Sequence, residues 1–396
     1  MIDFDEACRR VAAIAKPLGV EAVPPDQAWS RVLAAPVIAR RAAPEAAVSA
    51  MDGYAVCDAD LAPGRTLLHV AGESFAGSPS GGETLERGSC VRIFTGAPLP
   101  SGADRVVIQE LVQRDGDTIT IAERPSPARH VRAAGSDFAL GEVLLGAGTR
   151  LTPQALVAAA AADQGQVEVY IRPRVAILST GDELVAPGGA VRAPGAIPDS
   201  VSFGVRAMAR AWGGDVVSHR QLRDDLPQLR SAAAMALADA HVVVVTGGAS
   251  VGDRDFSKAM FEHLGLRLEF EKVAIKPGKP VWVGRVGNRI VIGLPGNPSA
   301  AMVTARLFLA PILAGLGGRF AQDALAWRAL PLLASLDACG DRECFHRGRS
   351  VADGVRPVGN EDSSAQKDLA LADLLIRRAP NARALSPGDL VEVLAF

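Results

Sequence analysis

Residues 241–256 read HVVVVTGGASVGDRDF, and this stretch determines which class of fold the chain can adopt. Four consecutive valines without polar alternation indicate a strand that is buried on both faces, as parallel strands in α/β domains are. Gly247 and Gly248 then allow the backbone to turn sharply and a ligand to approach the main chain closely. Two aspartates follow, and the second, Asp255, is well placed to cap a helix that begins at the next residue. Strand, glycine turn, acidic loop and helix together predict a ligand crevice at the carboxyl end of a strand.

The same rhythm of strand and helix extends from residue 171 to residue 318. Apolar strand patterns lie at 175–178, 215–217, 241–245 and 290–292, and helical patterns lie at 200–212, 227–240, 256–264 and 299–316. Strands that alternate with helices form βαβ units, so this segment predicts a doubly wound parallel sheet covered by helices.

The flanking segments have a different character. Residues 3–18 form an amphipathic helical pattern that Asp3 can cap, and a short second helix is expected at 27–33. Between 44 and 130, short apolar runs alternate with Gly, Pro and Ser clusters, which is typical of a small β-rich domain. A helix capped by Thr152 is expected at 153–163. After residue 318, short strand-like pieces return and predict a second β-domain.

Composition excludes several classes of protein. Hydrophobic residues make up 48% and charged residues 22% of the 396 residues, which is an ordinary globular mix. The net charge of −2 comes with no basic stripe, so nucleic acid is not an expected partner. The longest apolar runs are shorter than the ~20 residues of a membrane span. The five cysteines show no Cys-x-x-Cys spacing, which argues against a disulfide scaffold and a zinc site, and a cytoplasmic location is expected.

Carboxylates follow two further strands of the predicted sheet. The first strand ends in Thr180-Gly181-Asp182-Glu183, which repeats the order of apolar strand, glycine and acid. Two such strand ends in one sheet indicate a shared polar crevice that includes Glu183, although such acids can also be solvated turn residues. Asp225 precedes a helix, so it is either the N-cap of that helix or a third carboxylate at the crevice.

Two other stretches favour the binding of an anion. In KPGKP, a type II turn would bring Lys276 and Lys279 within about 7 Å at Cα. Like charges so close repel unless they are solvated or share an anion, and a tetrahedral oxyanion suits two ammonium groups. Residues 293–299, GLPGNPS, lead from a strand into a helix whose free N–H groups also suit an anion. The alternatives are a solvated turn and a plain connection capped by Ser299.

These motifs, with two more in the β-rich segment, resemble the molybdopterin molybdenumtransferases, the molybdenum-insertion enzymes of cofactor synthesis. The last domain of gephyrin is a relative of that family. The matching stretches occur in the family's order between residues 51 and 298: MDGYAV (51–56), TGAP (95–98), STGDEL (179–184), GGASVGDRD (247–255), KPGKP (276–280) and GLPGNP (293–298).

The resemblance implies that the chain is divided into four domains. These are an extended linker and dimerisation domain at 1–45 and 131–170, a β-rich lid at 46–130, an α/β molybdopterin-binding domain at 171–318, and a small β-barrel-like domain at 319–396. It also implies a homodimer in which the lid closes over the site of the partner subunit. The adenylyltransferase of the same pathway and recipient molybdoenzymes are further partners that it suggests.

The implied reaction inserts molybdenum from molybdate into adenylylated molybdopterin with the help of Mg²⁺ and releases AMP. The family's catalytic positions correspond here to Asp52, Glu183, Asp225, Asp255, Lys276 and Lys279, of which Asp225, Asp255 and Glu183 would bind the metal. Its substrate-binding positions correspond to Thr95, Arg132, Asp137, Gly247, Gly248, Ser250, Pro295, Asn297 and Pro298.

The chain departs from the family pattern at several positions. Val48 and Val201 stand where asparagine is usual, and the pattern Arg-x-x-Gly-Glu-Asp is reduced to RAAGSD at 132–137. These departures leave open a divergent paralogue that binds the cofactor or acts as a scaffold with weak or no insertase activity. A nucleotide or pterin hydrolase built on the same α/β domain is a further alternative.

Overall fold

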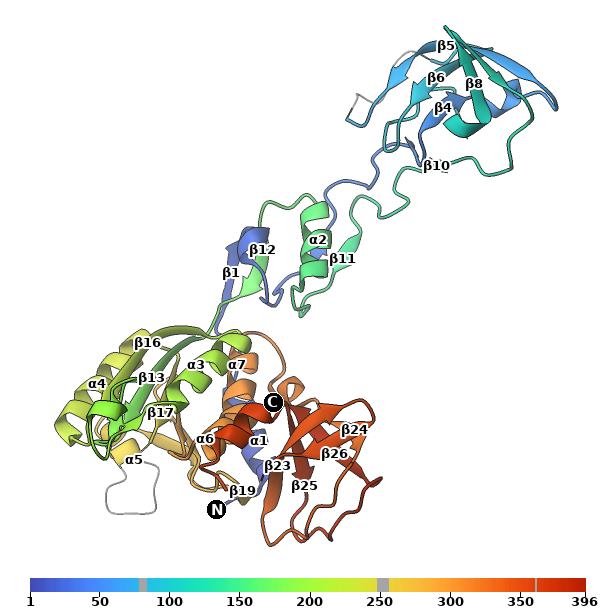
Figure 1. Ribbon diagram of the computed structural model, residues 1–396. Helices are drawn as coiled ribbons and strands as arrows, with labels where there is room; N and C mark the ends of the chain where they lie inside the picture. The colour runs from blue at the N-terminus through green and yellow to red at the C-terminus, as the bar shows by residue number, and fades with distance from the viewer. Residues whose placement is uncertain (78–83, 248–255, 360–361) are drawn as a thin grey trace. The chain divides into compact units, whose positions relative to one another are not determined.

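The computed structural model describes residues 1–77, 84–247, 256–359 and 362–396. These residues form two compact units. The first unit comprises Met1–Ala22, Ser30–Ala34 and Glu168–Phe396, and the second comprises Val23–Trp29 and Ala35–Val167. Figure 1 labels the helices and strands of both units. The α/β segment and the C-terminal β-segment therefore belong to one unit, while the four-part division at residues 45, 130, 170 and 318 stays a prediction.

A six-stranded sheet forms the centre of the first unit, in the order β16-β13-β17-β21-β20-β18. Its strands are β13 (Arg174–Thr180), β16 (Asp215–Leu222), β17 (Val242–Thr246), β18 (Arg267–Phe270), β20 (Trp282–Val286) and β21 (Arg289–Leu294). Helices α3 (Val201–Ala211), α4 (Leu226–Asp239) and α5 (Phe256–Glu262) join or flank these strands. The neighbours β16, β13, β17 and β21 run parallel, as the strand and helix pattern predicts.

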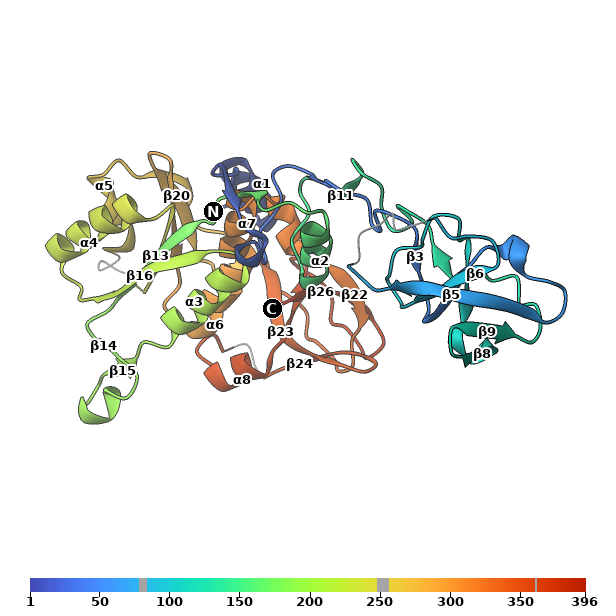
Figure 2. The same ribbon diagram turned by 90° about the horizontal axis from the view of Figure 1, so that it is seen from above.

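The valine run is apolar throughout because β17 is covered on both faces. Val242 and Val244 pack in a cluster with residues of α3, whereas Val243 and Val245 pack with residues of α4 and α5. Accordingly, α4 and α5 lie on one side of the sheet and α3 lies on the other (Figures 1 and 2). All four side chains are fully buried, so neither face of this strand tolerates a polar residue.

The four expected strands are the parallel ones, and two strands that the sequence pattern did not include add an antiparallel edge. Strands β20 and β21 pair antiparallel, with Val286 opposite Arg289, and β18 pairs antiparallel with β20. The sheet is therefore mixed. The hairpin turn is Gly287-Asn288, with φ of 58° at Gly287. A Gly-Asn pair between two apolar runs is a hairpin signal, so the sequence already carried this information.

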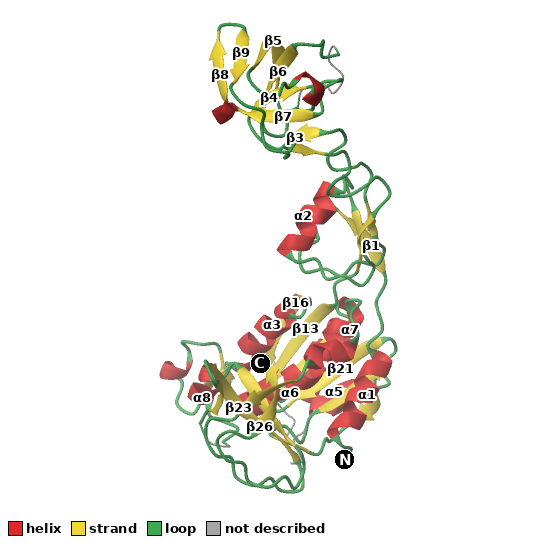
Figure 3. Ribbon diagram, turned by 90° about the vertical axis from the view of Figure 1, so that its right-hand side faces the viewer, coloured by secondary structure: helices red, strands yellow, loops and turns green. Residues whose placement is uncertain are grey.

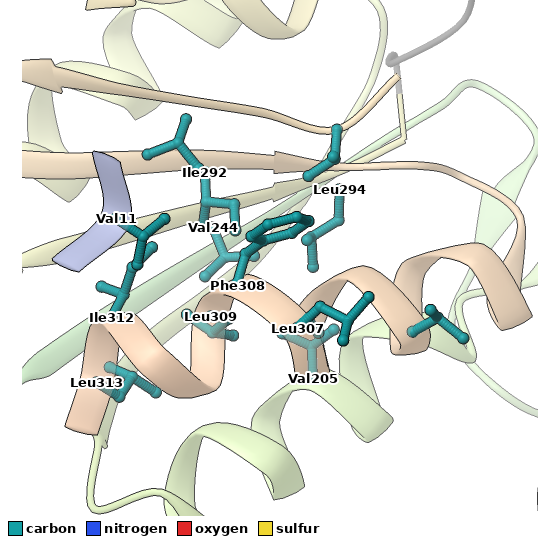
Figure 4. Close-up of a cluster of buried hydrophobic side chains, with 14 of the residues drawn as sticks. Val11, Val205, Val244, Ile292, Leu294, Leu307, Phe308, Leu309, Ile312 and Leu313 are labelled. Atoms are coloured by element: carbon teal, nitrogen blue, oxygen red, sulfur yellow. The ribbon is translucent and has the colours of Figure 1, made fainter. Parts of the chain in front are cut away.

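One long apolar helical segment, Pro298–Leu316, forms the core of the first unit. It consists of α6 (Pro298–Thr304), a π-helical turn (Ala305–Leu309) and α7 (Ala310–Leu316), which matches the helix expected at 299–316. Its length and hydropathy would allow a membrane span, yet 94% of it is buried inside the protein. Figure 4 shows Phe308 and Ile312 of this segment against Val244 and Ile292 of the sheet. The π-turn directly precedes Pro311, whose ring cannot fit a regular α-helical turn.

The N-terminal segment adds one helix to the same core. Helix α1 (Phe4–Ile14) begins where the sequence predicts, because the Asp3 carboxylate accepts a 2.7 Å hydrogen bond from the Glu6 N–H. It ends four residues earlier than expected. The helix expected at 27–33 does not form beyond a 3₁₀ turn at Pro25–Gln27. Leu33 instead makes an isolated bridge to Val169 and is fully buried, so packing of the extended chain overrides the local helical pattern.

The C-terminal residues form a second sheet in the same unit. Its order is β19-β23-β25-β26-β22, and β24 pairs with β23. The strands are β19 (Ile275–Lys276), β22 (Arg328–Pro331), β23 (Glu343–Val351), β24 (Gly354–Pro357), β25 (Leu374–Arg378) and β26 (Leu390–Ala395). Figure 3 shows these strands with helix α8 (Gln366–Leu371) beside β23. Strand β19 comes from the α/β segment, and it places Lys276 directly opposite Cys344 of β23.

The second unit contains a six-stranded sheet in the order β7-β4-β6-β5-β9-β8. Its strands are β4 (Gly53–Val56), β5 (Thr66–Ser74), β6 (Ser89–Ile93), β7 (Arg105–Ile108), β8 (Val112–Asp115) and β9 (Thr118–Ile121). This sheet confirms the β-rich character expected for residues 44–130. The unit also holds the short pair β3 (Val48–Ser49) and β10 (Val131–Arg132). Its helix α2 (Pro153–Ala161) is capped by Thr152, whose hydroxyl accepts from the Ala155 N–H.

Candidate functional site

A cavity of about 640 Å³ lies at the carboxyl ends of the parallel strands of the first unit. Thr180 at the end of β13, Thr246 at the end of β17, and Gly247 contribute to its wall. Gly247 has φ of 86°, and a Cβ at this position would lie 2.2 Å from the Thr180 carbonyl oxygen. Only glycine fits there, which explains the glycine directly after the valine run. We refer to this cavity as the crevice.

The crevice is also lined by the connection between β21 and α6 and by Glu183. Pro295, Asn297 and Pro298, all expected from the sequence, contribute to this wall. Asn297 donates a 2.9 Å hydrogen bond from Nδ2 to the Ser363 hydroxyl, which fixes its amide group. The N-cap of α6 is Asn297 and not Ser299. Gly248, Ser250 and Asp255 lie outside the described residues.

A buried polar network underlies the crevice. Thr246 Oγ1 donates to Ser179 Oγ over 3.2 Å, and His219 Nε2 lies 3.1 Å from Ser179 Oγ and 3.2 Å from Asp199 Oδ2. Asp199 also accepts a 3.2 Å hydrogen bond from the Ser202 N–H. Burial alone would raise the pKa of Asp199, but hydrogen bonds from His219 and Ser202 outweigh burial and lower the pKa to about 2. Asp199 is therefore a carboxylate that carries charge in the crevice wall.

Sequence reasoning did not identify Asp199 as a site residue. The signal was present, because an aspartate three residues before Ser202 is a typical N-terminal helix partner. Val201, one of the two positions where the family usually has asparagine, lines the same crevice. Valine at this position therefore contributes both to the wall of the crevice and to packing against the core.

The expected metal-binding acids Glu183 and Asp225 differ in their place in the fold and in their hydrogen bonds. Glu183 is exposed and lines the crevice. Asp225 is the N-cap of α4, and its Oδ1 accepts a 3.2 Å hydrogen bond from the Gln228 N–H. The loops that carry these two acids meet, because the Asp224 N–H donates to Asp182 Oδ1. The loops after β13 and β16 thus lie at one edge of the sheet, and Asp225 takes the N-cap position that was one of its two expected roles.

The two lysines of the KPGKP motif have different surroundings. Lys279 is exposed and is not among the residues that line the crevice or the second cavity described next. Lys276 is half-buried and lines a second cavity of about 470 Å³ beside β19 and β23 of the C-terminal sheet. Strand β19 holds Lys276 opposite Cys344 of β23. The convergence of the two lysines with the acids stays a prediction.

The second cavity brings a buried arginine close to the start of α6. Arg347 of β23 is 6% exposed and lines the cavity together with Lys276 and Ser299. One of its NH groups lies 3.1 Å from the Ser299 hydroxyl and 3.1 Å from the Ala365 carbonyl. We refer to this space as the cationic cavity. The start of α6 separates it from the crevice, because Asn297 and Pro298 line the crevice while Ser299 lines the cationic cavity.

The second unit carries the remaining expected site residues. Asp52 is exposed, and its Oδ1 accepts hydrogen bonds from the Thr95 N–H at 2.7 Å and the Thr95 hydroxyl at 2.8 Å. These bonds, helped by the charge of Arg92, hold the pKa of Asp52 below its usual value. The two motifs MDGYAV and TGAP are thus joined in the fold, although 43 positions separate the two residues.

Arg132 and Asp137 are both exposed in the second unit. Arg132 lies on β10, directly opposite Val48 of β3, so the thinned arginine pattern and the missing asparagine meet at one place. The structure therefore brings the two departures from the family pattern together.

Comparisons with known proteins agree with this architecture. The family model of the MoeA N-terminal region (domain I and II) matches residues 2–163, and that of a probable molybdopterin binding domain matches residues 176–315. The model of the MoeA C-terminal region (domain IV) matches residues 329–396. Together these three models cover most of the chain.

Whole-chain similarity is equally clear. A molybdopterin molybdenumtransferase of Haemophilus influenzae is 38% identical over 321 residues, which are 81% of this chain and 78% of that protein. One from Bacillus subtilis is 32% identical over 407 residues, covering 99% and 94%. The crystal structure of the molybdopterin biosynthesis MoeA protein of Pyrococcus horikoshii superimposes with a TM-score of 0.82 at 27% identity, covering 100% and 99%. The chain therefore belongs to the MoeA family of molybdopterin molybdenumtransferases, which insert molybdenum into molybdopterin in molybdenum cofactor biosynthesis.

Proposed function

We propose that the crevice binds adenylylated molybdopterin and that the cationic cavity binds molybdate, with the start of α6 between the two substrates. The observation that carries this proposal is the position of three consecutive residues. Asn297 and Pro298 line one cavity, and Ser299 lines the other. The two reactants would share this short segment as a common wall, and transfer requires molybdate to pass around it to reach the dithiolate.

The cationic cavity suits molybdate because it offers two positive charges and hydroxyl groups, against the single carboxylate of Asp337. Lys276 and Arg347 line it from β19 and β23, and Ser299 adds its hydroxyl from α6. An oxyanion bound by ammonium and guanidinium groups makes charge-assisted hydrogen bonds, which are the strong ones. Lys279 is the second lysine of the motif, and we assign it a weaker contribution because it is exposed.

The crevice suits a pterin nucleotide because its wall offers hydroxyls, an amide and carboxylates. Thr180 and Thr246 supply hydroxyls, and Asn297 supplies an oriented amide. Glu183 and Asp199 supply carboxylates, which can accept hydrogen bonds from the amino and ring N–H groups of a pterin. Gly247 also lines the crevice. Gly248, Ser250, Pro295 and Pro298 complete the substrate-binding residues that we propose.

The donor set at the sheet edge fits Mg²⁺. Glu183 and Asp225 offer carboxylate oxygens at neighbouring strand ends, and Asp255 is the third acid that we propose as a ligand. Glu183 and Asp225 are not part of a preassembled cage of three ligands among the described residues. That agrees with Mg²⁺, which is usually bound through one or two carboxylates, waters and substrate phosphates. When bound, the ion would polarise the phosphoanhydride of the substrate.

The chain's own residues would then act as follows. Lys276 and Arg347 neutralise molybdate and hold it beside the pterin dithiolate, and the hydroxyl and amide groups of the crevice orient the pterin nucleotide. The two dithiolate sulfurs would replace one oxo ligand of molybdate, which leaves with two protons as water. Attack of water on the phosphoanhydride would then release AMP and leave the terminal phosphate on the pterin. We further propose a cytoplasmic homodimer in which Asp52, Thr95, Arg132 and Asp137 of one subunit complete the site of the other.

The direct test is incubation of the protein with adenylylated molybdopterin, Mg²⁺ and molybdate, followed by measurement of AMP. We expect AMP to appear only when molybdate is present. Omission of Mg²⁺ is expected to slow the release, and sulfate in place of molybdate is expected to give none. AMP release at the same rate without molybdate would contradict insertion and would favour a hydrolase.

A further inference from the structure

Three potential metal ligands meet beside the cationic cavity. Cys339, Cys344 and His346 place their sulfur and ring nitrogen atoms within 4.8 Å of one another. Among the described residues, these three form the group of His, Cys, Asp or Glu side chains whose ligand atoms lie close enough to share a metal ion. None of the five cysteines forms a disulfide. The spacing Cys-x₄-Cys-x-His lacks the Cys-x-x-Cys signature, which is why cysteine counting argued against a zinc site.

Secondary structure places these three side chains together. Cys344 and His346 are two residues apart on β23, so their side chains point to the same face of the strand. Cys339 precedes the strand in a loop that two backbone hydrogen bonds hold at Cys339 and Gly340. The Cys339 N–H donates to the Ala382 carbonyl at 2.9 Å, and the Asn381 N–H donates to the Gly340 carbonyl at 2.7 Å. The loop is therefore anchored where it carries the third ligand.

The chemistry of the three groups selects the metal. Two thiolates and one imidazole form a soft donor set that suits Zn²⁺ and excludes Mg²⁺, which prefers oxygen. Two thiolates also cancel the charge of a divalent cation, so the metal and its ligands together would carry no net charge at this half-buried position. Lys276 lies opposite Cys344 in the sheet, and Lys276 and Arg347 line the same cavity as Cys344 and His346. Nearby cations favour the thiolate over the thiol.

The geometry leaves a fourth coordination position open. Cys344 and His346 both line the cationic cavity of about 470 Å³. A tetrahedral ion held by Cys339, Cys344 and His346 would therefore face this cavity with its remaining position, which water or another small ligand can fill. Cys344 Sγ also lies 3.5 Å from the Arg342 carbonyl oxygen, at the distance of a weak sulfur hydrogen bond.

We propose that Cys339, Cys344 and His346 form a binding site for a thiophilic divalent cation of the Zn²⁺ class. On binding, each thiol gives its proton to solvent and its sulfur bonds to the metal, and His346 binds through a neutral ring nitrogen. The site is separate from the Mg²⁺ donors of the crevice in residues and in chemistry. It does not depend on which substrates occupy the two cavities.

The test uses the fully reduced protein with Zn²⁺ and, as a spectroscopic probe, Co²⁺. We expect one equivalent of Co²⁺ to give a thiolate charge-transfer band and the visible absorption of tetrahedral cobalt, and Zn²⁺ to displace it. Cys339→Ser is the main variant, because Cys339 is half-buried and lies in a loop. We expect it to weaken Co²⁺ binding about tenfold or more and to abolish the second thiolate contribution.

Controls separate this site from the other thiols. Cys57→Ser removes a half-buried cysteine of the second unit and is expected to bind Co²⁺ as the unmodified protein does. His346→Ala should weaken binding while it keeps both thiolate bands, which a site formed by thiols alone would not show. Absence of a tetrahedral cobalt spectrum in the unmodified protein, or equal binding by Cys339→Ser and Cys57→Ser, would overturn the proposal. Neither result bears on molybdate-dependent AMP release, because no molybdate or pterin is present.

Discussion

Asp199 shows how a single buried residue can connect stability with the site. It is 3% exposed, yet it is ionised because His219 and Ser202 stabilise the carboxylate. A carboxylate whose pKa is lower in the folded than in the unfolded protein stabilises the fold above the unfolded pKa, and this stability is lost as pH falls through the folded pKa. The window here runs from about pH 4 down to about pH 2.

We predict that Asp199→Asn lowers the free energy of unfolding at pH 6 by on the order of 2 kcal/mol. The difference between the two proteins should shrink as the pH falls toward 3, because the unmodified carboxylate loses its advantage there. Urea unfolding at pH 6 and at pH 3 measures this. Asp323→Asn is a suitable control, because Asp323 is exposed. A difference that stays constant between the two pH values would show that the charge of Asp199 is not responsible.

Residue roles could be predicted from sequence only where a local pattern carries them. The acids after β13 and β16 lie at one sheet edge because parallel strands place their carboxyl ends together. The pairing of Asp52 with Thr95 spans 43 positions and was not predicted, because the resemblance to the family assigned each residue to a site separately. Arg347 was missed altogether, because its importance comes from burial beside Ser299, which no local pattern reports.

Among the elements, β17 and the turn after it were the most predictable. A run of valines must be buried on both faces, and the glycine that follows is required by the close approach of the Thr180 carbonyl. Strand β19 is the opposite case. Its two residues pair with β23, about 70 positions away. The pairing register of two such distant segments cannot be predicted from the sequence of either segment alone. The position of Lys276 opposite Cys344 follows from this strand and could not be predicted.

We predict that Gly247→Ala lowers the free energy of unfolding more than Gly265→Ala does. Both glycines have positive φ, 86° and 82°, but a Cβ at Gly247 would lie 2.2 Å from a backbone oxygen, whereas a Cβ at Gly265 meets nothing within 4 Å. Gly265→Ala should therefore cost only the conformational strain of about 1–2 kcal/mol. Thermal or urea unfolding of both variants measures the difference. Equal losses would mean that the turn after β17 can shift to accept a side chain.

At the scale of the whole molecule, the expected site residues are divided between two compact units. Glu183, Asp225 and Lys276 belong to the first unit, and Asp52 and Thr95 belong to the second. A homodimer in which the second unit of one chain completes the site of its partner would unite them. A C₂ dimer built in this way contains two such sites, each made from both chains.

Mixed dimers test whether the site is shared. Asp52→Asn and Lys276→Gln are expected to be inactive as separate homodimers at a low molybdate concentration. A heterodimer of one Asp52→Asn chain and one Lys276→Gln chain, isolated through two different tags, would contain one site with neither change. We predict about half of the AMP release of the unmodified dimer. No activity above that of the separate variants would mean that each site lies within a single chain.

The most direct test of the proposed molybdate site is the dependence of AMP release on molybdate concentration for the unmodified protein, Lys276→Gln and Lys16→Gln. Lys276 lines the cationic cavity, whereas Lys16 is exposed after the end of α1. Loss of a charge-assisted contact is expected to raise the half-saturating molybdate concentration about tenfold or more for Lys276→Gln. Lys16→Gln should leave it unchanged. Superimposable molybdate curves for Lys276→Gln and the unmodified protein would contradict molybdate binding in the cationic cavity.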